Sequence, residues 1–237
     1  MKTTFIVTML QFVFFLAAPE NAEAQSPEFV NCLGSSRDFR AEGIKIVSAK
    51  LRRKGSFKYP QIAGPRTPQE RKFNADVLKV VLKDVTANGG EEYLFSVSFA
   101  TPEFVSVHLI STFCGASCHA GIIAFNFDLK TGKQITKLSE LFKPKSNYLK
   151  TIASYSVGAL TRCSGDELDI KDDWFMEGTK PTAKNYSIWS LTRDGVRITF
   201  PEYQIAPGAF SGVDVVVPYS HLKGMLREDV EWFRLLN

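Results

Sequence analysis

The sequence predicts an α+β domain, in which an antiparallel β-sheet carries helices packed on one side. Short runs of alternating apolar residues recur along the chain between turn signals, as is typical of antiparallel hairpins. Two segments instead repeat apolar residues at spacings of three and four, which indicates helices. Strands and helices do not alternate regularly, as a parallel sheet would require. The 237 residues, 44% of them apolar, suffice for one domain of two interlocked halves, about 25–135 and 136–237.

The N-terminus has the pattern of a secretory signal peptide. A single charge at Lys2 precedes an apolar run from Phe5 to Ala18, and Ala22-Glu23-Ala24 offers small residues at a cleavage site. The apolar run is too short for a convincing membrane span, and no later segment is apolar enough to be one. We therefore expect residues 1–24 to be removed, leaving a periplasmic or secreted domain, residues 25–237, without a membrane span.

The first half is expected to begin with a strand and a helix. Residues Ile44 to Tyr59 alternate and carry basic side chains, which predicts an exposed first strand. Thr67-Pro68-Gln69-Glu70 combines an N-cap, a proline at the first helical position and a reciprocal capping glutamate. The apolar spacing that follows predicts a helix to about Val85.

A β-meander is expected next. Alternating residues from Tyr93 to Phe99 and from Val105 to Leu109 predict two strands of an antiparallel hairpin. A third strand is expected at Ile122–Leu129, which makes Cys114–Gly121 the connection between two strands.

The second half is expected to hold a helix, a hairpin, a strand and a final helix. The Asp194-Gly195 pair is a strong two-residue turn signal, so it sets the position of the hairpin. The expected elements are a helix at about Asn147–Thr161, hairpin strands at Ser187–Leu191 and Val196–Phe200, a strand at Val213–Val217 and a helix from Ser220 to about Leu235.

Four cysteines behind a signal peptide indicate two disulfides, for which three pairings are possible. The simplest pairing closes a tight loop between Cys114 and Cys118 and joins Cys32 to Cys163. A metal site of Cys114, Cys118 and His119 matches no standard zinc spacing, and an oxidising compartment favours disulfides. No metal and no cofactor are expected.

The sequence gives little support for catalysis or for nucleic-acid binding. His108 lies in mid-strand and His221 at a helix start, so both are expected to be structural. His119 lies beside Ser117 in the cysteine loop, but residues two apart have no defined geometry and no acidic third partner can be named. The alternative is a cell-wall hydrolase with His119 and a carboxylate such as Asp128 as an acid–base pair. The net charge of +4 is modest and its basic side chains are spread along the chain, which does not indicate a nucleic-acid partner.

The leading candidate for a contact surface is the proline-rich segment between Phe200 and Val213, joined by the cysteine loop. Loops held on rigid strands are where recognition residues gather. The alternative is that the apolar residues of this segment fold back over the edge of the core. The expected binding residues are Tyr203, Ile205, Ala206, Pro207 and Phe210, together with Ser117 and His119.

Several stretches together resemble one bacterial family. They are Phe200–Pro207, Gly212 and Val215–Leu222, with His119, Phe125–Lys133 and Leu138–Phe142 upstream and Tyr59–Ile62 and Phe73-Asn74 in the first half. This series is similar to the extracytoplasmic domain shared by the lysozyme-sensing anti-sigma factor RsiV and the accessory domain of some peptidoglycan deacetylases, described as DUF3298 and DUF4163.

The resemblance implies a secreted α+β domain that acts by binding and is not an enzyme. Its implied partners are an envelope protein, lysozyme-like, or the glycan of peptidoglycan, and a lysozyme inhibitor is the alternative function. Two departures fall on the expected contact surface. The family usually has Gly-Gly-Ala before its histidine where this chain has Cys114–Cys118, and often an aromatic residue where this chain has Gly208.

Overall fold

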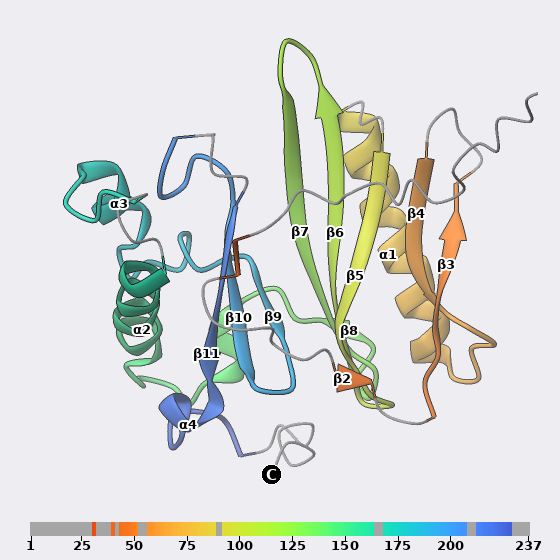
Figure 1. Cartoon of the computed structure of the whole chain (residues 1–237). Coiled ribbons are helices and arrows are strands. Elements are labelled where there is room, and N and C mark those ends of the chain that lie inside the picture. Colours follow the sequence, from red (N-terminus) through yellow and green to blue (C-terminus); the bar gives the residue numbers. More distant parts are fainter. Residues whose placement is uncertain are drawn as a thin grey trace, which may run out of the picture.

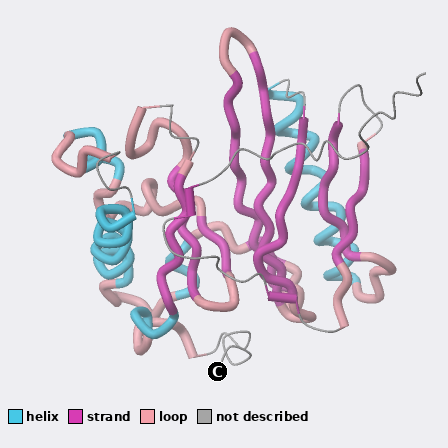
Figure 2. Tube along the Cα trace, viewed as in Figure 1, coloured by secondary structure: helices cyan, strands magenta, loops and turns pink. Residues whose placement is uncertain are grey.

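Two β-sheets pack against each other between helices in the computed structural model, which describes residues 30–31, 39–40, 43–51, 56–88, 92–163, 168–207 and 212–228. The smaller sheet has four strands in the order β1-β11-β10-β9, and the larger has seven, in the order β3-β4-β5-β6-β7-β8 with β2 beside β5. Helix α1 lies on the outer face of the larger sheet and α2 beside the smaller one (Figures 1 and 2). The expected α+β class is confirmed.

The elements follow one another along the chain with short connections. They are β1 (Val30–Asn31), β2 (Phe39–Arg40), β3 (Ile46–Lys50), β4 (Ser56–Ile62), α1 (Pro68–Asn88), β5 (Glu92–Ala100), β6 (Phe104–Cys114), β7 (Cys118–Asp128), β8 (Lys133–Gln134), the 3-10 helix η1 (Leu138–Leu141), α2 (Tyr148–Cys163), α3 (Asp173–Gly178), β9 (Trp189–Leu191), β10 (Gly195–Phe200), β11 (Val213–Pro218) and α4 (Tyr219–Leu222).

Helix α1 begins as the sequence predicts. The Thr67 hydroxyl accepts the backbone N–H of Glu70 at 3.1 Å, and the Glu70 carboxylate accepts the N–H of Thr67 at 3.1 Å. This reciprocal pair satisfies two donors that the first turn would otherwise leave unpaired. The helix buries Phe73 and Val77 against the larger sheet, where the Phe73 ring meets that of Phe125 edge-on at 5.6 Å.

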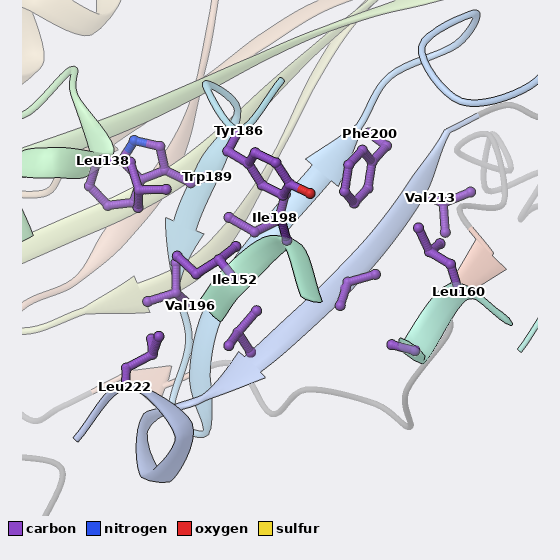
Figure 3. Close-up of a cluster of buried hydrophobic side chains, with 14 of the residues drawn as sticks. Leu138, Ile152, Leu160, Tyr186, Trp189, Val196, Ile198, Phe200, Val213 and Leu222 are labelled. Carbon is purple, nitrogen blue, oxygen red and sulfur yellow. The ribbon is translucent and has the colours of Figure 1, made fainter. Parts of the chain in front are cut away.

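The smaller sheet forms the second core with α2. Side chains from β10 and β11 interdigitate with Ile152 and Leu160 of α2, and Trp189 and Tyr186 lie in the same cluster (Figure 3). Each large apolar side chain buried in this way contributes roughly 1.5–3 kcal/mol. Phe99 and Phe104 of the larger sheet belong to this cluster too, so the two predicted halves share a core.

The interface between the sheets is polar at its centre. Ser106 and Asn126 are buried neighbours on β6 and β7 and hydrogen-bond to each other. The Asn126 amide donates to the carbonyl of Trp189 at 2.9 Å, and the N–H of Leu191 donates to the Ser106 hydroxyl at 3.0 Å. Strand β9 is thereby docked through hydrogen bonds onto the face of the larger sheet opposite α1.

The expected single antiparallel sheet is wrong in detail. Strands β4 and β5 pair in parallel across α1, as do β1 with β11 and β2 with β5. One strand–helix–strand unit is enough to create a parallel pair, because the helix returns the chain to the same end of the sheet. Helices also cover the outer faces of both sheets rather than one side of a single sheet.

Three expected boundaries also need correction. The strand expected over Ile44–Tyr59 is the antiparallel pair β3 and β4, because alternation carries no sign of where a strand turns back. The connection expected over Cys114–Gly121 ends at Cys118, where β7 begins. The last helix stops at Leu222, since Gly224 adopts a positive φ of 82° that breaks helical geometry. Residues 229–237 lie outside the described residues.

Candidate functional site

The hairpin of β6 and β7 ends in a covalently closed tip. The two strands pair from Phe104 opposite Asp128 to Cys114 opposite Cys118, and a disulfide joins those two cysteines. Three small residues make the turn, in which the N–H of Gly115 donates to the carbonyl of Ser117 at 2.9 Å. Figure 1 shows this hairpin extending beyond the neighbouring strands. The disulfide restricts the motion of a turn that would otherwise be free at its end.

Next to the tip, His119 joins two residues that are far apart in the sequence. Its Nε2 lies 2.8 Å from the Ser117 hydroxyl, and its Nδ1 lies 3.1 Å from Oε2 of Glu202. The other Glu202 oxygen accepts the N–H of Ala120 at 3.2 Å. The side chains of His119 and Glu202 are 32% and 12% exposed. Glu202 therefore connects the hairpin tip to the loop that follows β10.

That loop is held in one conformation by contacts on several sides. Tyr203 has a φ of 63°, a left-handed conformation that is strained for a bulky residue. The indole N–H of Trp174 donates to the carbonyl of Tyr203 at 2.8 Å. The Gln204 amide donates to the carbonyls of Gly178 and Asn185, both at 2.9 Å. These bonds compensate the strain and direct the Tyr203 ring outward, where the residue is 51% exposed.

Aromatic rings surround the imidazole of His119. The ring of Phe113 lies 5.8 Å from it and the ring of Tyr203 5.9 Å, measured between centroids. Trp174, which is 40% exposed, extends this area toward α3. We call the whole area the tip–loop surface, and it consists of Phe113, Ser117, His119, Trp174, Glu202 and Tyr203.

Comparison with known proteins places the second half of the chain in a family. Residues 139–220, which include Trp174, Glu202 and Tyr203, match the family described as "Protein of unknown function (DUF3298)". The chain carries a DUF3298 domain. The family resemblance expected from the sequence is confirmed.

Similar proteins include one curated relative and two solved structures. The peptidoglycan-N-acetylmuramic acid deacetylase PdaC of Bacillus subtilis is 25% identical over 104 residues, which make up 44% of this chain and 22% of the deacetylase. This chain therefore spans less than a quarter of the length of that relative.

The two structures show the fold. A DUF3298 family member from Bacteroides fragilis aligns with a TM-score of 0.54 at 13% identity, over 82% of this chain and 98% of that chain. A DUF3298 family protein from Pseudomonas aeruginosa aligns with a TM-score of 0.53 at 15% identity, over 79% and 95% of the two chains. The shared fold thus extends well beyond residues 139–220 and into the first half of the chain.

Of the residues expected to bind, the DUF3298 structure brings Ser117, His119 and Tyr203 together and leaves them accessible. Pro207 is exposed, and Phe210 lies outside the described residues. Ile205 and Ala206 are 4% and 6% exposed and belong to the core, so their side chains anchor the loop instead of facing a partner. Binding by any of these residues stays a prediction.

Sequence reasoning missed the acidic partner of His119. Asp128, the carboxylate considered for that role, lies at the opposite end of β7 and caps a turn by accepting the N–H groups of Lys130 and Thr131. Glu202 takes the role instead, and its position beside Tyr203 in the candidate loop was the only local signal. Trp174 gave no signal, because its contact with the loop is purely tertiary.

The other predicted sites have mixed outcomes. The Cys114–Cys118 disulfide is confirmed. Cys163 at the end of α2 is disulfide-bonded, while Cys32 lies outside the described residues, so their pairing stays a prediction. Within the described ranges, no three His, Cys, Asp or Glu side chains are grouped to hold a metal ion, and no helix there is long and apolar enough to cross a membrane.

Proposed function

We propose that this DUF3298 protein is an extracytoplasmic binding module of the bacterial cell envelope, and that its tip–loop surface binds the glycan of peptidoglycan. The observation that carries the proposal is the exposed Tyr203 ring, fixed beside hydrogen-bonding groups from a second sheet. An aromatic ring offers a flat apolar face to the C–H groups of a sugar, and neighbouring polar groups can bond its hydroxyls.

The rigidity of the surface supports a binding role. The tip is closed by its disulfide, and the loop is anchored by Ile205, Ala206 and the two bonds of Gln204. A contact surface that is already ordered loses little conformational entropy when a ligand binds. The strained backbone of Tyr203 is of the kind that persists where surrounding contacts and function require it.

The relative supports the class of ligand. The name of the Bacillus subtilis protein describes an enzyme that acts on peptidoglycan, and this chain matches a part amounting to 22% of it. A part of that size beside a catalytic domain is suited to holding the enzyme on its polymer. We infer the same class of partner for this chain, and a location outside the cytoplasm.

A second candidate partner is a lysozyme-like protein, whose capture would make this chain a lysozyme inhibitor. Trp174 and Tyr203 favour it, since both are large, exposed and joined through a hydrogen bond. Trp and Tyr are the residue types that most often dominate the energy of protein interfaces.

Co-sedimentation with purified peptidoglycan sacculi tests the proposal. We expect the full chain to sediment with sacculi and Tyr203→Ala to lose at least tenfold in affinity, while its melting temperature stays within a few degrees. Leu82→Ala, which removes a comparably exposed side chain from α1, is the matched control and should bind normally. Equal binding by both variants would disprove the role of the tip–loop surface.

A muramidase assay separates the second candidate from the first. Lysozyme turnover is measured with rising concentrations of the full chain and of Tyr203→Ala. Inhibition by the full chain alone, without sedimentation on sacculi, would identify a lysozyme-like protein as the partner. Unchanged turnover at micromolar concentrations would remove that candidate.

A further inference from the structure

The hydrogen-bonded series Ser117, His119 and Glu202 has the atom order of a serine hydrolase site. The neutral imidazole with its proton on Nδ1 satisfies both contacts, because Nδ1–H donates to Glu202 at 3.1 Å and Nε2 accepts from the Ser117 hydroxyl at 2.8 Å. A serine, a base within hydrogen-bonding distance and a third group that orients the base are the parts that activate a hydroxyl nucleophile.

Glu202 is suited to orienting the base. Its side chain is only 12% exposed, and its second oxygen is fixed by the N–H of Ala120 at 3.2 Å. A carboxylate held in this way keeps the imidazole in one orientation and stabilises the positive charge that forms when Nε2 takes a proton. The rings of Phe113 and Tyr203 flank the imidazole and restrict its rotation.

The turn that carries Ser117 supplies the remaining requirements. The Cys114–Cys118 disulfide fixes the backbone on both sides of the nucleophile, as preorganised catalysis needs. In the described part of the chain, no protein acceptor bonds the N–H of Ala116 or of Ser117. Backbone N–H groups beside a nucleophile are the usual donors to a developing oxyanion.

We propose that Ser117, His119 and Glu202 form a hydrolytic site for short-chain acyl esters, such as an acetylated sugar hydroxyl. This activity goes beyond the binding proposed above. Ser117 is exposed, so the site is open to solvent and stabilises charge less than an enclosed pocket does. Esters are therefore the suitable class, because an alcohol is a better leaving group than the amine of an amide.

The reaction balances with water as the only co-reactant. The Ser117 Oγ forms a bond to the ester carbonyl carbon while its proton passes to Nε2 of His119. The bond from that carbon to the alcohol oxygen then breaks, and the departing oxygen takes the proton from Nε2. Water attacks the acyl-serine and gives a proton to Nε2, which returns it to Ser117. The products are an alcohol and a carboxylic acid.

The test combines covalent labelling with turnover on the purified full chain. We expect a fluorophosphonate to add to Ser117, as located by intact mass and peptide mapping, and 4-nitrophenyl acetate to be hydrolysed. Ser117→Ala should abolish the label and lower turnover by about a hundredfold or more, and His119→Gln should do the same. Glu202→Gln, which keeps the size of the positioning side chain, should lower turnover at least tenfold and retain the fold.

Ser187→Ala is the matched control, because Ser187 is an exposed serine of another loop. It should keep both the label and the turnover. Labelling of another residue, or equal turnover by the unaltered chain and Ser117→Ala, would overturn the proposal. Sedimentation with sacculi is measured on the same unaltered chain, so that retained binding without hydrolysis defeats this inference alone.

Discussion

His108 is a buried histidine whose position on β6 determines its charge. It is 5% exposed, and its Nε2 has no hydrogen-bond partner within the described residues. Burial lowers the pKa of His108 to about 4, while Asp214 opposes this shift and Arg197 adds to it. Desolvation outweighs the nearby carboxylate, so the imidazole is neutral at neutral pH. His108 is therefore part of the structure and not a general base, as the sequence also indicated.

The first prediction concerns this histidine and acid. An unfolded histidine has a pKa near 6.5, so between about pH 6.5 and 4 the unfolded chain binds a proton that the folded chain does not. The free energy of unfolding should fall as the pH drops through this window, by roughly 3 kcal/mol from His108 alone. Urea denaturation of the unaltered chain and of His108→Leu at pH 7 and 4 measures the difference.

The carboxylates titrate in both proteins, so only the difference between their pH profiles reports on His108. His221→Gln, at an exposed histidine, is the control and should keep the profile of the unaltered chain. Parallel profiles for the unaltered chain and His108→Leu would show that the imidazole gains a partner or solvent on protonation.

At the scale of elements, the loop after β10 shows what a sequence can and cannot predict. Pro201 and Pro207 exclude a strand interior, so the loop itself was predictable. Which of its apolar side chains face solvent was not, because an irregular segment has no period from which to assign faces. The left-handed backbone at Tyr203 directs that ring outward, whereas Ile205 and Ala206 enter the core.

The second prediction tests how α3 supports this loop. A Cβ on Gly178 would lie 2.0 Å from the carbonyl oxygen of Gln204 and 3.0 Å from Ile205. Gly178→Ala must therefore displace the loop and should destabilise the fold by about 1–3 kcal/mol. Loss of the contact between the Tyr203 and His119 rings, observed by NMR, and a lower melting temperature would confirm this.

Gly158→Ala in α2 is the matched control for that change. The nearest atom to its new Cβ is the end of the flexible Arg162 side chain, at 3.4 Å. Alanine is the better helix former, so this variant should gain about 0.5–1 kcal/mol. If both substitutions had the same effect, close packing of α3 on the loop would be excluded.

At the scale of the whole molecule, alternation predicted the meander but not what covers it. Val105, Val107 and Leu109 mark the apolar face of β6, and α1 packs there as the sequence implies. The polar residues between them have the pattern of a solvent-exposed face. Ser106 instead bonds β9 of the second sheet. The same limit applies to His119 and Glu202, since nothing local relates residues 83 positions apart.

The third prediction concerns this polar contact between the sheets. Asn126→Ala removes the donor to Trp189 and the partner of Ser106, and it leaves buried polar groups unpaired. We expect a loss of about 2–4 kcal/mol in the free energy of unfolding, measured by urea denaturation. Ser106→Ala should also destabilise, because it leaves the N–H of Leu191 without its acceptor.

A double-mutant cycle shows whether the two side chains act as one unit. Since each loses its partner when the other is removed, the double variant should cost less than the two single changes together, by about 1 kcal/mol. Asn126→Ala combined with Thr86→Ala on the exposed side of α1 should instead be additive. Additivity of Ser106→Ala and Asn126→Ala would mean that apolar packing alone docks the sheets. The tip–loop surface, which both sheets build, would then not depend on this contact for its geometry.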